Sequence, residues 1–268
     1  MKARVSLAIA LSALLLLGSS AAAQAPNDTA MCRLTIVYDN VSFDQTLSTD
    51  WGFSCLIEGF EQTMLFDTGA RASLLQATLS QLHCNVASID HVILSHNHSD
   101  HVGGLPLLIR PGRSLNVLCP TSFVPTSTGS VSAQWITYTG VSAPQPICDG
   151  IWTTGELGVA IIEQSLVLQT TAGLVVLTGC AHPGIINIVQ HVNAMFPDEP
   201  IYLVIGGFHL LDLPEPRLRA TAQQLIDLGV LHVAPTHCSG DLTRTVFAEV
   251  FGEVYVEAGL GWTIEIPL

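Results

Sequence analysis

The segment LSHNHSDHVGGL, residues 94–105, is the strongest constraint that the sequence places on the structure. It holds four potential metal ligands within six positions, His96, His98, Asp100 and His101. The run HVILSH predicts a strand that ends at His96, after which Asp100 and His101 begin a helix that VGGLPLLI continues. His96 and His98 are two residues apart on an extended segment, so their side chains point the same way and can share one ion.

The spacing of these ligands predicts two adjacent metal ions, because Asp100 and His101 face a position next to the first one. Nitrogen and oxygen ligands of this kind suit zinc. Gly103 and Gly104 allow the backbone to approach the site closely. A solvated polar loop would explain one histidine, but it does not explain four ligands directly after an apolar strand.

The second half of the chain offers three histidines that each follow a predicted strand in a turn of small residues. These are His182 in LTGCAHPG, His209 in IGGFHLL and His237 in APTHCSG. No histidine lies between His101 and His182. We therefore expect any remaining imidazole ligand to come from these three positions in preference to His83, His91, His191 or His232.

The elements predicted along the chain alternate between strands and helices. Short runs rich in β-branched and aromatic residues predict strands within 33–67 and 91–96, with a helix over 72–82. Residues 120–150 predict loops with short strands. Strands over 174–179, 201–207 and 231–237 and helices over 185–195 and 215–228 follow. The pattern predicts one α/β domain, residues 26–268, built from two units of sheet and helix.

The first 25 residues have the pattern of a secretory signal peptide. Lys2 and Arg4 precede an apolar run over residues 5–17, and GSSAAAQA supplies a cleavage site after Ala25. No later segment approaches the roughly 20 continuous apolar residues that a membrane span requires. We expect a secreted or periplasmic protein without a stable membrane anchor.

The charge balance narrows the class of partner. Removing residues 1–25 takes away two cations and no acid, so the formal net charge of −13 becomes −15. Nucleic acid is then excluded as a partner, because its binding depends on basic side chains that neutralise phosphates. The mature chain has no lysine and seven arginines. We expect a small-molecule substrate, and the pattern leaves the oligomeric state open.

The cysteines of an exported chain favour disulfides over a cysteine-based zinc site. There are seven, which permits up to three disulfides, and none lies in a C-x-x-C pair. The connectivity stays open.

The segment SHNHSDHVGGL resembles the H-x-H-x-D-H signature of the metallo-β-lactamase-fold superfamily, and LFDTG upstream is similar to its first motif. The segments WGFSCLIE, LTGCAHPGIINIV, IGGFHLL and PTHCSG resemble the branch named for 7,8-dihydropterin-6-yl-methyl-4-(ribofuranosyl)aminobenzene-5′-phosphate synthase. This resemblance implies a four-layer αββα sandwich with two metal ions at the sheet edges. It further implies two ligand sets, His96, His98 and His182 on one metal and Asp100, His101 and His237 on the other.

One position departs from the pattern of the hydrolytic relatives, because LTGC places Cys180 where they have a bridging aspartate. Either Cys180, His209 or a water takes that role, or the second metal site is weaker. The metal could be zinc, iron or manganese. The resemblance also implies that Asp67 orients a ligand from outside the metal shell.

A dinuclear site predicts hydrolysis of a phosphoester, lactone or amide-type bond, because bound metal makes hydroxide available near neutral pH. We expect Asp100 to orient the hydroxide and His209 to contact the oxyanion or the substrate. Two alternatives stay open. A non-catalytic metal-binding module would keep the fold only. A homodimeric aspartic protease would use Asp67 in LFDTGA, although no second D-[ST]-G occurs in the chain.

Overall fold

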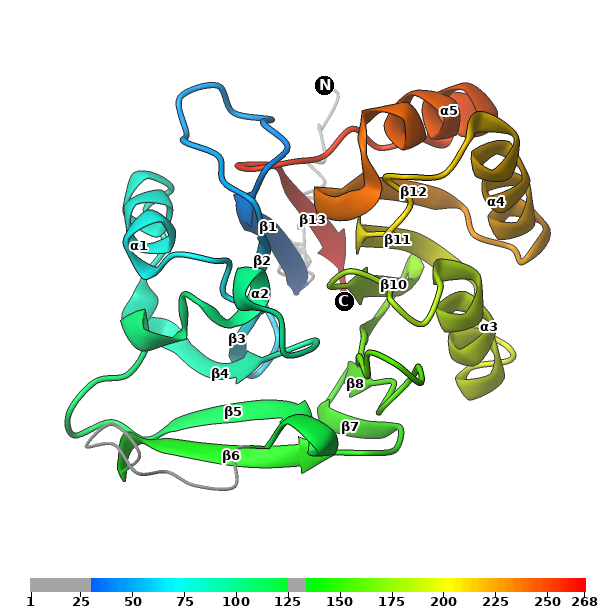
Figure 1. Ribbon diagram of the computed structural model, residues 1–268. Helices are drawn as coiled ribbons and strands as arrows, with labels where there is room; N and C mark the ends of the chain where they lie inside the picture. The colour runs from blue at the N-terminus through cyan, green and yellow to red at the C-terminus, as the bar shows by residue number, and fades with distance from the viewer. Residues whose placement is uncertain (1–29, 125–133) are drawn as a thin grey trace, which may run out of the picture.

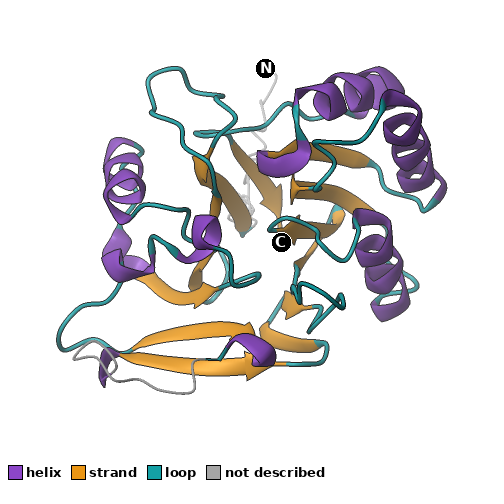
Figure 2. Ribbon diagram, viewed as in Figure 1, coloured by secondary structure: helices purple, strands orange, loops and turns teal. Residues whose placement is uncertain are grey.

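The computed structural model describes residues 30–124 and 134–268. Within these ranges the strands form two sheets that pack face to face, with helices on the outer side of each (Figures 1 and 2). The signal peptide predicted for residues 1–25 lies outside the described residues and stays a prediction. None of the helices in the described ranges has the length and apolar character needed to cross a bilayer.

The first sheet has seven strands in the order β13-β1-β2-β3-β4-β5-β6. β3, β4, β5 and β6 run parallel to one another, and the pairs on the β1 side are antiparallel. The strand bounds are β1 Met31–Asp39, β2 Phe53–Glu58, β3 Thr63–Phe66, β4 Ile89–Ile93, β5 Leu115–Pro120, β6 Ile136–Val141 and β13 Thr263–Pro267.

The second sheet has six strands in the order β12-β11-β10-β9-β8-β7, of which β10, β11 and β12 are parallel. The bounds are β7 Gln145–Cys148, β8 Ile151–Thr153, β9 Leu166–Thr170, β10 Gly173–Thr178, β11 Ile201–Gly207 and β12 His232–Thr236. The helices are α1 Ala72–Gln81, α2 Ser99–Val102, α3 Ile185–Met195, α4 Glu215–Asp227 and α5 Asp241–Phe251.

Three apolar clusters join the four layers. A strand such as β10 contributes to two of them, because its successive side chains point to opposite faces of the sheet. Val175 and Leu177 join the cluster between the sheets, whereas Leu174 and Val176 join the cluster beneath α3, α4 and α5. A third cluster lies between the first sheet and α1. The arrangement is the αββα sandwich that the sequence predicted.

The parallel strands of both sheets direct their carboxyl ends toward the same region of the molecule. The loops after β3, β4, β10, β11 and β12 carry the motif residues, and in open α/β sheets such loops form the ligand site. The glycine pair has the predicted role: a Cβ at Gly103 would lie 2.0 Å from the Ala70 carbonyl oxygen, and one at Gly104 would lie 2.0 Å from that of Thr68.

Several predicted elements needed correction. β4 ends at Ile93, so His96 lies beyond the strand rather than at its last residue. The helix that begins at Ser99 ends at Val102, before the glycine pair, and a separate 3₁₀ turn follows at Leu105–Leu107. All seven cysteines are free thiols, whereas the sequence permitted up to three disulfides. Five of these thiols are buried, three of them within the apolar clusters.

Candidate metal centre

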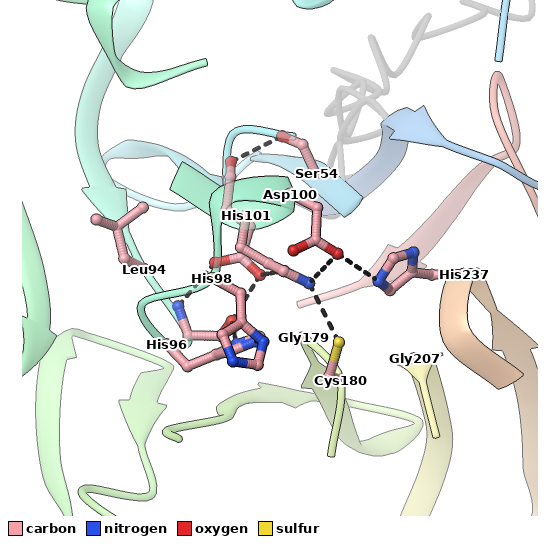
Figure 3. Close-up of polar contacts among 12 residues, drawn as sticks. Ser54, Leu94, His96, His98, Asp100, His101, Gly179, Cys180, Gly207 and His237 are labelled. Atoms are coloured by element: carbon pink, nitrogen blue, oxygen red, sulfur yellow. Dashed lines mark hydrogen bonds and ion pairs between the residues drawn. The ribbon is translucent and has the colours of Figure 1, made fainter. Parts of the chain in front are cut away.

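Turns from distant parts of the chain bring the predicted ligands to one point (Figure 3). The first triad consists of His96, His98 and His182, whose ligand atoms all lie within 4.8 Å of one another. His96 Nε2 lies 3.0 Å from His98 Nδ1, and the ring centroids of His96 and His182 are 4.8 Å apart. This is the ligand set that the sequence assigned to one metal.

The second triad consists of Asp100, His101 and His237, again within 4.8 Å. Asp100 Oδ2 lies 3.6 Å from His101 Nε2 and 3.5 Å from His237 Nε2. Figure 3 shows this carboxylate between the two rings. The ring centroids of His96 and His101 are 4.3 Å apart, so the two triads are adjacent. Which of the six residues bind metal stays a prediction.

Cys180 lies beside both triads. Its Sγ is 3.2 Å from His101 Nε2, and the two residues form a third group with His96 whose ligand atoms lie within 4.8 Å. The thiol therefore lies beside both triads at the sequence position where the hydrolytic relatives have a bridging aspartate. A hydrogen bond with the neighbouring Cys238, together with burial, raises the pKa of the Cys180 thiol. A metal ion bound to the sulfur would favour the thiolate instead.

The chemistry of this donor set fits two metal ions. The Nε2 atoms of His182 and His237 are buried and have no hydrogen-bond partner among the described residues, although buried polar atoms normally have one. Burial and the neighbouring rings of His209 and His98 lower the pKa of His182 to about 4, which keeps the imidazole neutral. Burial opposes ionisation of Asp100, but the adjacent rings of His237 and His101 outweigh it and lower the pKa of Asp100.

Hydrogen bonds from outside the triads fix three of the imidazoles. The Nδ1 atom of each ring has an oxygen partner, which leaves Nε2 free for metal. The pairs are His96 Nδ1 with Ser95 Oγ at 2.8 Å, His101 Nδ1 with Asp67 Oδ2 at 2.7 Å, and His237 Nδ1 with Asn40 Oδ1 at 2.8 Å.

Asp67 is completely buried and both of its oxygens are engaged. Oδ1 accepts the Ser95 backbone N–H, and Oδ2 accepts from Ser95 Oγ and the His101 ring. This arrangement matches the orienting role predicted for Asp67. It leaves no oxygen to share a proton with a second aspartate, as the protease alternative requires.

The backbone of the centre is strained. Five non-glycine residues in the described ranges have positive φ, and four of them lie here, namely Asp67, Ala181, His209 and His237. Such conformations cost free energy and tend to be kept where function requires them.

Glu163 supports the turn that carries Cys180 and His182, and sequence reasoning missed it. Its carboxylate is completely buried. It accepts the backbone N–H groups of Gly179, Cys180 and Ala181 at Oε1 and that of His182 at Oε2, at 2.9 to 3.2 Å. Burial raises the pKa of Glu163, and these N–H groups act in the opposite direction. The one feature of the sequence that could have indicated its role is that Glu163 is the only acidic residue in the apolar stretch VAIIEQSLVL.

His209 lies at the exposed rim of the centre. Its ring centroid is 4.3 Å from that of His182, and a hydrogen bond with Cys238 raises the pKa of the His209 imidazole. Its predicted contact with substrate remains a prediction. Two other histidines bond backbone carbonyls away from the triads, His191 with Thr154 and His232 with Val254.

Comparison with known proteins agrees with this geometry. Residues 52–132 match the Metallo-beta-lactamase superfamily. The structure is similar to that of Tm1679, described as a metal-dependent hydrolase of the beta-lactamase superfamily, with a TM-score of 0.76 and 25% identity over 88% of this chain and 100% of the other. The metallo-beta-lactamase fold protein YhfI from Bacillus subtilis gives a TM-score of 0.63 at 16% identity, covering 88% of this chain and 99% of that one, a likeness of fold.

The chain is similar to the metallo-β-lactamase superfamily in sequence over residues 52–132 and in fold over most of its length. Within that superfamily it is similar to the 7,8-dihydropterin-6-methyl-4-(beta-D-ribofuranosyl)-aminobenzene-5′-phosphate synthase of Methanocaldococcus jannaschii. The two sequences are 27% identical, and the match covers 86% of this chain and 95% of the relative. This relative carries the name of the branch that the sequence motifs resemble.

Proposed function

We propose that the chain is a metal-dependent hydrolase that uses two zinc ions, held by the two triads, to activate water against an ester, lactone, phosphoester or amide-type bond. The observation that carries the proposal is the adjacency of two complete ligand sets, each with three donor atoms within 4.8 Å. Adjacent ions can supply hydroxide near neutral pH and polarise the bond that it attacks. Iron and manganese are the alternative metals.

Each residue has a defined part in this proposal. Asp100 is held as a carboxylate between His101 and His237, where it can orient an attacking hydroxide. His209 lies beside His182 at the rim and can donate to an oxygen of the substrate. Cys180 supplies a soft ligand beside His101, which favours zinc over magnesium or manganese.

The name of the similar synthase from Methanocaldococcus jannaschii suggests a second candidate function, a reaction that forms a phosphorylated pterin compound. The identity of 27% over most of the chain favours it. The predicted signal peptide points to export, to a secreted or periplasmic location, and so away from this role. A non-catalytic metal-binding module is disfavoured by the strained backbone of the centre, because such strain tends to be kept at functional sites.

Removal of metal tests the proposal. We expect the purified protein to hydrolyse model esters or phosphodiesters, to lose that activity when a chelator strips the metal, and to regain it when zinc is added back. The rate is followed by release of 4-nitrophenolate, with circular dichroism as the control that the fold survives chelation. Activity that the chelator does not change would contradict the metal mechanism.

A further inference from the structure

Two cavities flank the candidate metal centre. One, of about 460 Å³, is lined by His182 together with residues such as Leu157, Val159 and Pro183. The other, of about 270 Å³, is lined by His209 and Cys238 together with Trp51, Leu211 and Leu213. Because the rings of His182 and His209 are 4.3 Å apart, both cavities adjoin one pair of imidazoles at the rim.

The walls of these cavities are mainly apolar and open to water. Val159 is 97% exposed, Leu211 is 52% exposed and Trp51 is 45% exposed. They make up three of the nine exposed large apolar side chains in the described ranges. Trp51 also lies against His237, with ring centroids 4.8 Å apart. Exposed apolar side chains gathered beside a polar centre are typical of a ligand-binding surface.

No lysine or arginine lines either cavity among the described residues, and the one carboxylate there is Asp212. Five arginines are paired with carboxylates elsewhere, as in Arg33 with Glu265, Arg71 with Asp50 and Arg219 with Glu215. The whole chain has a net charge of −13, which opposes the approach of anions. An anionic group on the body of a substrate would find no cationic side chain here.

We infer that the substrate is an uncharged carboxylic ester or lactone whose aliphatic or aromatic body lies in these cavities, and not a phosphorylated or carboxylated compound. The inference rests on the proposed hydrolase function. The triads would hold the reacting carbonyl, and Trp51, Leu211 and Val159 would bind the body through burial of apolar surface.

A matched pair of substrates tests the inference. 4-Nitrophenyl hexanoate and the mono-4-nitrophenyl ester of adipic acid have the same acyl length, but the adipate has a terminal carboxylate. We expect the zinc-loaded protein to prefer the hexanoate by about tenfold or more in kcat/KM, because an unpaired charge is costly to desolvate. We also expect hexanoate to exceed acetate by at least about tenfold, since each buried methylene contributes up to roughly fourfold.

Arginine substitutions test whether the cavity walls cause the preference for the uncharged substrate. Val159→Arg and Leu211→Arg place a cation at the cavity walls on exposed positions, and each is expected to shift the ratio of hexanoate to adipate toward adipate by about two- to fivefold. Leu231→Arg is the matched control, because Leu231 is 48% exposed and precedes the amino end of β12, away from the centre. It is expected to leave the ratio unchanged.

The outcomes separate the two proposals. Preference for the adipate, or for bis(4-nitrophenyl) phosphate, that depends on zinc would overturn the inference and leave the hydrolase function standing. A ratio that neither cavity variant changes would also overturn it. Absence of zinc-dependent turnover of every one of these compounds would overturn both proposals.

Discussion

Replacement of His98 by alanine is expected to remove one equivalent of metal per chain and to lower kcat/KM by about a thousandfold or more. In the proposed centre His98 would share a metal ion with His96 and His182. It is half-buried, so its loss opens the first triad without disturbing the core. A catalytic metal contributes several kcal/mol to transition-state stabilisation, and about 4 kcal/mol corresponds to a thousandfold.

The measurements are elemental mass spectrometry and the rate of zinc-dependent ester hydrolysis. His191→Ala is the matched control, because His191 is also half-buried but bonds the Thr154 carbonyl outside the two triads. It is expected to keep the metal and the rate. A His98→Ala protein that hydrolyses at the parental rate would favour a non-catalytic role for the triads.

Glu163→Ala is expected to lower the free energy of unfolding by about 3–5 kcal/mol, because it leaves four buried N–H groups without an acceptor, each costing roughly 1–3 kcal/mol before the turn relaxes. The same turn carries Cys180 and His182, so the affinity for zinc should fall about 10–100-fold. Urea unfolding with chelator present measures the first effect, and competition with a coloured zinc chelator measures the second.

Two comparison variants sharpen this test. Glu163→Gln keeps the Oε1 acceptor, which receives three of the four bonds, and is expected to lose about 1 kcal/mol. Glu199→Ala removes a half-buried glutamate whose carboxylate accepts from Gln169, far from the ligand turn, and should leave zinc affinity unchanged. Zinc affinity that is equal in Glu163→Ala and the parent would remove Glu163 from the support of the centre.

Elements with a strong apolar period were predictable from the sequence. The bounds of α3 at Ile185–Met195 and of β11 at Ile201–Gly207 agree with the predicted ranges. The reason is that α3 has one apolar face and β11 is a continuous apolar run between turn residues. The strand pattern narrowed the distant ligands to His182, His209 and His237, and the family resemblance assigned His182 and His237 to the two triads. The strands before His182 and His237 belong to the same sheet, which brings the two turns to one edge.

Interactions between residues far apart in the chain were not predictable. Asn40 is 197 positions from His237 and Glu163 is 16 to 19 positions from the turn that it supports, and neither has a local spacing that signals its role. The strand β13 was missed because its pairing with β1 joins the two ends of the domain. Strand ends were misplaced near the ligands, because the chain leaves the sheet at Ile93 and bends to bring His96 and His98 together.

The proposed function requires two metal ions in the two triads, and the metal content per chain tests this requirement. We expect elemental mass spectrometry of the purified protein to find about two equivalents of zinc, iron or manganese, as a dinuclear centre requires. Metal content near zero that persists after reconstitution with zinc would contradict the proposed function.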